Sequence, residues 1–149
     1  MRLLTYLFCG CFILCSAYRP LFAAEIWNIK IKDKVISVEI AQSETEQQMG
    51  LGNRFALAEG SGMLFTYRKP GNRVFWMKRM HFAIDILWLL QGKIVHIEEN
   101  VPPPESGTPD SNLKLYGKGI VADMVLEVPA GYTRRNKINT GDTVQIKNR

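Results

Sequence analysis

Residues 84–99, IDILWLLQGKIVHIEE, decide the fold. The segment Ile84–Leu90 is apolar apart from Asp85, so a strand here carries apolar side chains on both faces. Gln91–Gly92 predicts a two-residue hairpin connection into a second strand over Lys93–Glu99. A strand that is apolar on both faces belongs in the centre of a sheet or in the wall of a small barrel.

Alternating apolar and polar residues predict further strands on both sides of this hairpin. Ser43 and Glu46 have the spacing of a capping box and predict a short helix. We expect strands over residues 27–31, 36–40, 62–67, 74–78, 120–128 and 143–147, a turn at 70–72, a long loop at 101–115 and helices over 44–49 and 130–137. The predicted fold class is α+β, mainly antiparallel β: a small curled sheet or barrel of about seven strands with two short helices.

Composition limits the classes of protein that fit the chain. Its 149 residues correspond to one domain, and 46% hydrophobic against 22% charged residues is enough to bury a core. The formal net charge of +5 is basic but lacks the clustering of a dedicated nucleic-acid binder. Multi-domain enzymes, coiled coils and multi-span membrane proteins are excluded, and we expect no nucleic-acid partner.

The first 24 residues have the pattern of a secretory signal. Arg2 precedes an apolar run, and small residues near Ala24 offer a cleavage site, although an uncleaved anchor is the alternative. We therefore expect a signal peptide at 1–24, a single β-rich domain at 25–149 and a periplasmic or otherwise extracytoplasmic location. After cleavage the protein would not be integral to the membrane. The three cysteines would leave with the signal, and the net charge would fall to +3.

The hairpin brings chemistry-bearing residues into register. With a two-residue loop, Asp85 faces Glu98 and Leu87 faces His96, so Asp85, His96 and Glu98 share one face. Two carboxylates and an imidazole suit either an acid–base pair or a divalent metal. Ordinary ion pairs and packed strand ends explain the same residues, and we expect no metal or cofactor. A one-residue change of register would separate the three side chains.

Trp76 and Lys78 share a face if their segment is a strand. An aromatic ring beside a cation suits ligand recognition, and it also suits a lysine that extends along the core surface. We expect Trp76, Lys78 and Asp85 to be the ligand-binding residues if the protein binds a small molecule.

Several short motifs occur together in one order. They are Phe75-Trp76-Met77-Lys78 followed by Ile84-Asp85-Ile86, Gly50-Leu51 with Arg54, Gly62-Met63-Leu64-Phe65, Glu99-Asn100 with Pro102-Pro103, the run from Val125 to Gly131, and Gly141-Asp142. On these motifs the chain, from about Val35 to Ile146, resembles the family known as domain of unknown function 192, mostly small exported prokaryotic proteins. The resemblance implies a compact β-rich domain at the cell envelope and supplies no reaction. Arg79-Met80 and Gly52 depart from the family pattern of Asn-Thr and Met.

Three functions remain open from the sequence. The first is a non-catalytic envelope binding or accessory domain, whose groove beneath the 101–115 loop holds a small molecule, glycan or envelope protein. The second is a small hydrolase- or lyase-type enzyme that uses Asp85 and Glu98, with or without a metal at His96. The third is a structural protein whose loop docks on an envelope partner. We expect a monomer in each case.

Overall fold

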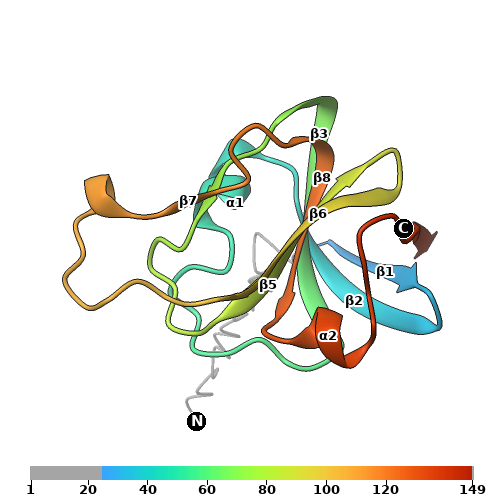
Figure 1. Cartoon of the computed structure of the whole chain (residues 1–149), viewed down its shortest axis with the longest axis horizontal. Coiled ribbons are helices and arrows are strands. Elements are labelled where there is room, and N and C mark those ends of the chain that lie inside the picture. Colours follow the sequence, from blue (N-terminus) through green and yellow to red (C-terminus); the bar gives the residue numbers. More distant parts are fainter. Residues whose placement is uncertain (1–24, 149) are drawn as a thin grey trace, which may run out of the picture.

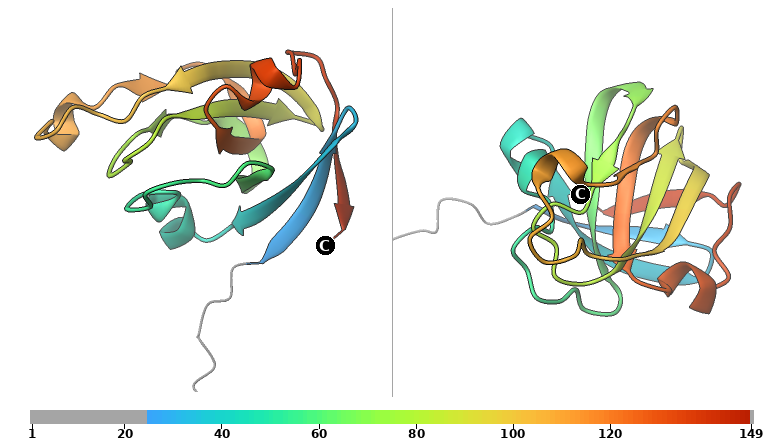
Figure 2. Two further views of the ribbon diagram at one scale, coloured as in Figure 1. Left: turned by 90° about the horizontal axis from the view of Figure 1, so that it is seen from below. Right: turned by 60° about the vertical axis from the view of Figure 1, so that its left-hand side comes forward.

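Seven strands form one mixed, strongly curled sheet in the computed structural model, which describes residues 25–148 (Figures 1 and 2). The order across the sheet is β6-β5-β8-β3-β2-β1-β9, and β4 and β7 pair separately. The strands are β1 (Ile26–Ile31), β2 (Lys34–Ala41), β3 (Ser61–Asn72), β4 (Phe75–Trp76), β5 (Ile84–Leu90), β6 (Lys93–Val101), β7 (Leu115–Tyr116), β8 (Val121–Pro129) and β9 (Val144–Asn148). The helices are α1 (Glu44–Met49), the single 3₁₀ turn η1 (Asp110–Asn112) and α2 (Tyr132–Arg135). The predicted fold class is confirmed.

Antiparallel pairing dominates, with one parallel pair. β2 and β3 run parallel, joined by a crossover that contains α1. At the far ends of the sheet β6 approaches β9 through an isolated bridge between Lys93 and Thr143. The backbone of Ile94 also bonds Gly141 and Asp142. These contacts close one end of the curl, so the sheet forms a half-barrel.

Both faces of the central strands are buried, as the sequence of β5 predicts. Alternation along the strands places Leu87 and Leu126 in one core cluster and Ile86 and Val125 in another. The second cluster also contains residues from the segments between strands, including Leu51, Met77, Met80 and Tyr116. Those segments therefore cover the second face, and the candidate site lies among them.

Three local predictions need correction. Residues 70–72, predicted to turn, belong to the end of β3, where Gly71 pairs with Ala122 beyond an irregularity. Pro70 lies at that irregularity, which suits a residue without a backbone N–H. Of the predicted strand 74–78, only the two residues of β4 form a strand. Of the predicted helix 130–137, only the four residues of α2 are helical.

The long loop after β6 extends from the same side of the sheet as α1 and carries η1 near its tip (Figure 2). The predicted signal peptide, residues 1–24, lies outside the described residues. Within residues 25–148, none of the helices is long and apolar enough to cross a membrane.

Candidate functional site

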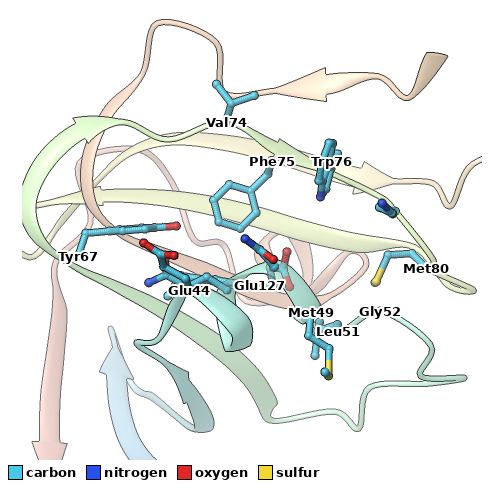
Figure 3. Close-up of a pocket in the computed structure, with 15 residues that line it drawn as sticks. Glu44, Met49, Leu51, Gly52, Tyr67, Val74, Phe75, Trp76, Met80 and Glu127 are labelled. Carbon is cyan, nitrogen blue, oxygen red and sulfur yellow. The ribbon is translucent and has the colours of Figure 1, made fainter. Parts of the chain in front are cut away.

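A pocket of about 280 Å³ opens between α1, β3 and the segment around β4 (Figure 3). Small-molecule sites in proteins usually measure about 300–1,000 Å³, so this pocket lies just below that range and has room for a compact ligand. Its lining combines an apolar and aromatic wall with a few charged groups. The aromatic and charged members are Glu44, Phe65, Tyr67, Phe75, Trp76, Lys78 and Glu127.

Helix α1 forms one wall, and its own sequence fixes its ends. The Ser43 side chain accepts from the Glu46 backbone N–H, and the Glu46 side chain accepts from the Ser43 backbone N–H, which confirms the predicted capping box. Gln47 then ties the helix to the sheet, because its amide donates to the carbonyl oxygens of Ala41 and Thr66 at 3.3 and 3.0 Å. The wall is therefore held by polar contacts, although α1 buries no residue completely.

Aromatic rings form the opposite wall. Phe75 packs edge-to-face against Phe65 and Trp88, with ring centroids 4.9 and 6.0 Å apart. The Trp88 indole is fully buried and donates to the carbonyl oxygen of Arg73 at 2.6 Å. Trp76, by contrast, is 46% exposed and lies at the rim. Packing thus fixes the ring of Phe75, whereas the ring of Trp76 stays accessible to solvent.

Glu127 lies in this pocket as an almost completely buried acid. It is a β8 residue, 5% exposed, and its neighbours across the sheet are the apolar side chains Met63 and Ile86. Its Oε2 atom is buried and has no hydrogen-bond partner among the described residues. Burial raises the pKa of Glu127 from 4.5 to about 8, although the nearby Arg54 opposes the rise. Most of the carboxyl is therefore protonated at pH 7.

Two cations near the pocket, Arg54 and Lys78, have carboxylate partners. Arg54 makes a bidentate ion pair with Glu39, with Nη2 2.7 Å from Oε2, and this contact lowers the pKa of Glu39. Lys78 at the rim contacts Asp110 of η1 at 2.6 Å. Both positive charges are thus paired with groups outside the pocket lining, and among the described residues neither makes an ion pair with Glu127.

The structure brings Trp76 and Lys78 together in this pocket. The Lys78 ammonium lies 5.5 Å from the centroid of the Trp76 ring. The space beneath the long loop is a separate pocket of about 190 Å³, whose lining includes Met77 and Tyr116 but neither Trp76 nor Lys78. Lys78 contacts the loop through its ion pair with Asp110, so the groove beneath the loop and the Trp76–Lys78 pair belong to different pockets.

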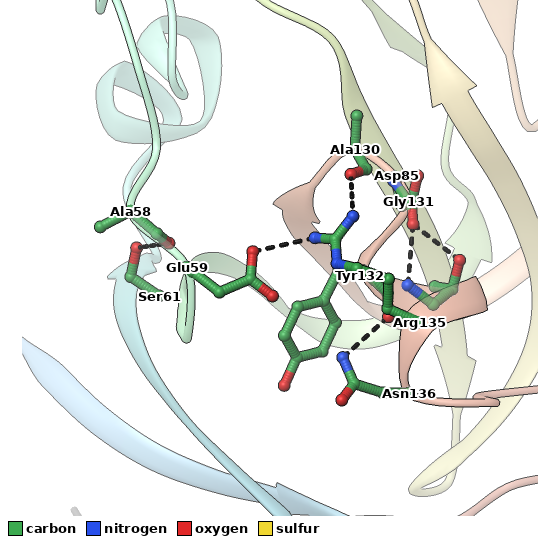
Figure 4. A network of polar contacts seen from close by, with 10 residues as sticks. Ala58, Glu59, Ser61, Asp85, Ala130, Gly131, Tyr132, Arg135 and Asn136 are labelled. Atoms are coloured by element: carbon green, nitrogen blue, oxygen red, sulfur yellow. Dashed lines mark hydrogen bonds and ion pairs between the residues drawn. The ribbon is translucent and has the colours of Figure 1, made fainter.

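Asp85 lies elsewhere, beneath the start of α2 (Figure 4). Its Oδ1 accepts from the backbone N–H groups of Asn100 and Gly131, at 2.8 and 2.9 Å. Its Oδ2 accepts from the backbone N–H and the hydroxyl of Thr133, at 2.9 and 2.6 Å. A carboxylate has about four acceptor positions, so this side chain is saturated. The geometry gives Asp85 a structural role, and its participation in ligand binding stays a prediction.

The predicted alignment of Asp85 with His96 and Glu98 is wrong by one residue. Gln91–Gly92 forms the expected two-residue turn, but a bulge between Trp88 and Leu89 pairs Trp88 with His96 and Ile86 with Glu98. His96 contacts Glu98 at 3.3 Å on the face opposite to Asp85. Within residues 25–148 no three His, Cys, Asp or Glu side chains are placed to hold a metal ion.

Reasoning from the sequence did not single out Glu127. Its signal is the pattern VLEVP at residues 125–129, where one acid interrupts an apolar strand. Such an acid is either on a solvated face or buried, and only the tertiary structure decides between the two. Gly52 and Met80, which depart from the family pattern, also line this pocket.

Comparisons with known proteins agree with this architecture. One solved structure, a protein from Sinorhizobium meliloti 1021 described as a "putative transcription regulator", shares 23% identity over 84% of this chain and 96% of its own, with a TM-score of 0.73. Another, a protein of unknown function from Novosphingobium aromaticivorans DSM 12444, shares 24% identity over 85% and 89%, with a TM-score of 0.74. At these identities the likeness shows the fold. Among curated proteins nothing matches the chain.

A family model covers nearly all of the described residues. It is DUF192, described as an uncharacterised family, and it matches residues 27–146. The match includes the hairpin, the pocket and the Asp85 network, so these features belong to one domain. The chain is therefore a member of the DUF192 family.

Proposed function

We propose that the protein is a non-catalytic binding domain of the cell envelope that holds a small molecule in the pocket between α1 and β4. The observation that carries the proposal is the buried Oε2 atom of Glu127, which has no partner among the described residues. An unsatisfied buried polar atom lowers stability unless a ligand or water completes its hydrogen bonds. The exposed ring of Trp76 at the rim supplies apolar contact area for such a ligand.

The pocket adjoins a second one of about 440 Å³ that shares Trp76 and Lys78 with it, and its own volume suits a small molecule. At about 280 Å³ it encloses a compact ligand. The extracytoplasmic location follows from the signal-like segment at residues 1–24 and is part of the proposal.

A ligand screen tests the proposal directly. We would screen the whole chain against a library of small polar and amphiphilic compounds by saturation-transfer NMR. We expect hits that weaken at least tenfold in Trp76→Ala. The matched control is Phe55→Ala, because Phe55 is an aromatic residue, 85% exposed, outside the pocket lining. A screen without hits, or hits that Trp76→Ala leaves unchanged, would overturn binding at this pocket.

An enzyme remains the second candidate, and one observation favours it. Glu127, with its pKa raised to about 8, could donate a proton at neutral pH in the manner of a general acid. This residue fits the role better than Asp85 and Glu98, because Asp85 is saturated and Glu98 pairs with His96. Mass spectrometry of each hit after incubation separates the candidates, since a binding domain returns its ligand unchanged and an enzyme does not.

A further inference from the structure

When it is ionised, the buried carboxyl of Glu127 can only accept hydrogen bonds, so the partner that it lacks in this form is a donor. Some side chains of the lining carry N–H or O–H groups, namely Gln47, Gln48, Tyr67, Trp76 and Lys78, but none of them is bonded to Oε2. Oε2 has no partner among residues 25–148. A ligand that carries N–H groups into the pocket would complete the hydrogen bonds of this oxygen.

The charges around the pocket favour a positively charged donor. The lining contains two acids, Glu44 and Glu127, and one lysine, Lys78. Lys78 is neutralised by Asp110 at 2.6 Å. Arg54, whose positive charge lowers the Glu127 pKa, is held by Glu39 in a bidentate pair. A bound anion would find no uncommitted cation in the lining, whereas a bound cation would meet two carboxyl groups.

The wall can take the rest of such a ligand. Phe75 and Trp76 lie on the opposite side of the pocket from Leu51 and Met49 in Figure 3, with Glu127 between them in this view. Aromatic faces attract cations as well as apolar groups. The protein already shows this pairing at the site, because the Lys78 ammonium lies 5.5 Å from the Trp76 ring centroid.

We infer that the pocket binds a small organic ammonium ion, whose N–H groups hydrogen-bond the Glu127 carboxylate and whose apolar part packs against Phe75 and Trp76. This inference rests on the proposed binding function and names its ligand class. A quaternary ammonium ion would fit less well, because it has no N–H to donate.

Binding of an ammonium ion would displace a proton from Glu127. Between about pH 5 and 8 the empty pocket holds a protonated carboxyl, because burial raises its pKa to about 8. An ammonium ion favours the carboxylate, so the proton leaves to the buffer as the ligand binds, and the affinity rises with pH across this range. Several charged and titratable groups surround Glu127. Arg54 is paired with Glu39, and Arg73 lies over the ring of Tyr67. The others are Glu44 and Lys78 in the pocket lining and Glu98, which faces Ile86, the β5 neighbour of Glu127.

Three probes of similar shape test the ligand class. We would measure dissociation constants of the whole chain for benzylamine, benzyl alcohol and benzoate by titration calorimetry at pH 7.5. We expect benzylamine to bind at least tenfold more tightly than benzyl alcohol, and benzoate to bind most weakly. In Glu127→Gln the preference for the amine should fall below twofold. Glu105→Gln is the control and should keep the preference, because Glu105 is exposed and lies outside the pocket lining.

A second measurement does not depend on a variant. Titrations of benzylamine at pH 6.5 in two buffers of different ionisation enthalpy should show net proton release on binding. No release, or benzyl alcohol binding as tightly as benzylamine through Trp76, would overturn the ammonium ligand and leave the binding function standing. If none of the three probes binds and the library gives no Trp76-dependent hit, both the ligand class and the binding function are wrong.

Discussion

The Oδ2 atom of Asp85 lies 2.6 Å from the hydroxyl oxygen of Thr133, a residue 48 positions further along the chain. The same hydroxyl lies 3.2 Å from Oε1 of Glu99, and with one proton it can donate to only one of the two acids at a time. Thr133 is fully buried, so the contact joins β5 to α2 away from solvent. Asp85 thereby holds the N-terminal end of a helix too short to be stable alone.

Replacement of Asp85 by asparagine should destabilise the domain. The new NH₂ group would meet N–H donors that now bond a carboxyl oxygen, so we expect a loss of about 2–4 kcal/mol in the free energy of unfolding. Urea denaturation followed by circular dichroism measures it. The control Asp33→Asn alters an exposed acid and should leave the unfolding midpoint almost unchanged. Weaker ligand binding at Trp76 in folded Asp85→Asn would contradict a purely structural role.

Stability should fall as the pH rises from about 5 to 8 because of Glu127. Its pKa is about 8 in the folded protein, against an ordinary value of 4.5, which we take for the unfolded chain. Between these values the folded protein holds a proton that the unfolded chain has lost, so the contribution declines by about 1.4 kcal/mol per pH unit. Below pH 4.5 Glu127 makes its full contribution to the free energy of unfolding, and above pH 8 that contribution falls no further.

Glu127→Gln tests this dependence. The amide cannot ionise, so we expect a flatter curve of unfolding free energy against pH and a variant more stable than the wild type at pH 8. Urea titrations at intervals between pH 5 and 8.5 measure both effects. Glu105→Gln, at an exposed position, should retain the wild-type slope. Equal slopes in the wild type and Glu127→Gln would show that Glu127 does not carry the proton.

Arg54 should control the pKa of Glu127. Its positive charge lowers that pKa, although its direct ion pair is with Glu39. Arg54→Gln should therefore move the titration midpoint of Glu127 further above its value in the wild type. Carbon-13 NMR of the Glu127 carboxyl during a pH titration gives the midpoint. The control Arg135→Gln removes an exposed pair with Glu59 and should not move it, whereas a midpoint lowered by Arg54→Gln would contradict the assignment.

The sequence predicts the hairpin of β5 and β6 because its signals are local. Gln91–Gly92 adopts the left-handed conformation at both positions that a tight hairpin turn requires. The bulge that follows has no comparable signal. It lies next to Ile94, whose backbone N–H and C=O bond Asp142 and Gly141 from the other end of the sheet. A contact between segments so distant in sequence cannot be deduced from the alternation of either segment, and the face assigned to Asp85 was wrong for that reason.

In the candidate site, too, features with a local sequence signal could be predicted, and features that depend on distant segments could not. The proximity of Trp76 and Lys78 could be predicted because the pairing of a ring with a cation two residues away depends on neighbours in sequence, and their role in ligand binding stays a prediction. Glu127 was not, because its burial depends on α1 and on the segment around β4, which cover that face of β8. The parallel pairing of β2 with β3, which places α1 over the pocket, likewise depends on a crossover connection rather than on local alternation.

Gly117 should tolerate no side chain, because it lies against the ring of Trp88. A Cβ at Gly117 would lie 2.4 Å from Trp88 Cζ2, and the residue has a positive φ of 73°. Gly119 has a similar φ of 81°, but nothing lies within 4 Å of its Cβ position. Both alanine variants incur the left-handed backbone penalty of about 1–2 kcal/mol, and only Gly117→Ala must also displace a buried indole.

We therefore expect Gly117→Ala to lose at least about 1 kcal/mol more unfolding free energy than Gly119→Ala. Because Trp88 packs on Phe75, the same variant should change tryptophan fluorescence and weaken any ligand bound at the pocket. Urea denaturation and emission spectra of the two variants measure these effects. Equal losses of stability in both variants would mean that the Trp88 ring can move away from Gly117, and that the inner aromatic wall of the pocket is not fixed by packing.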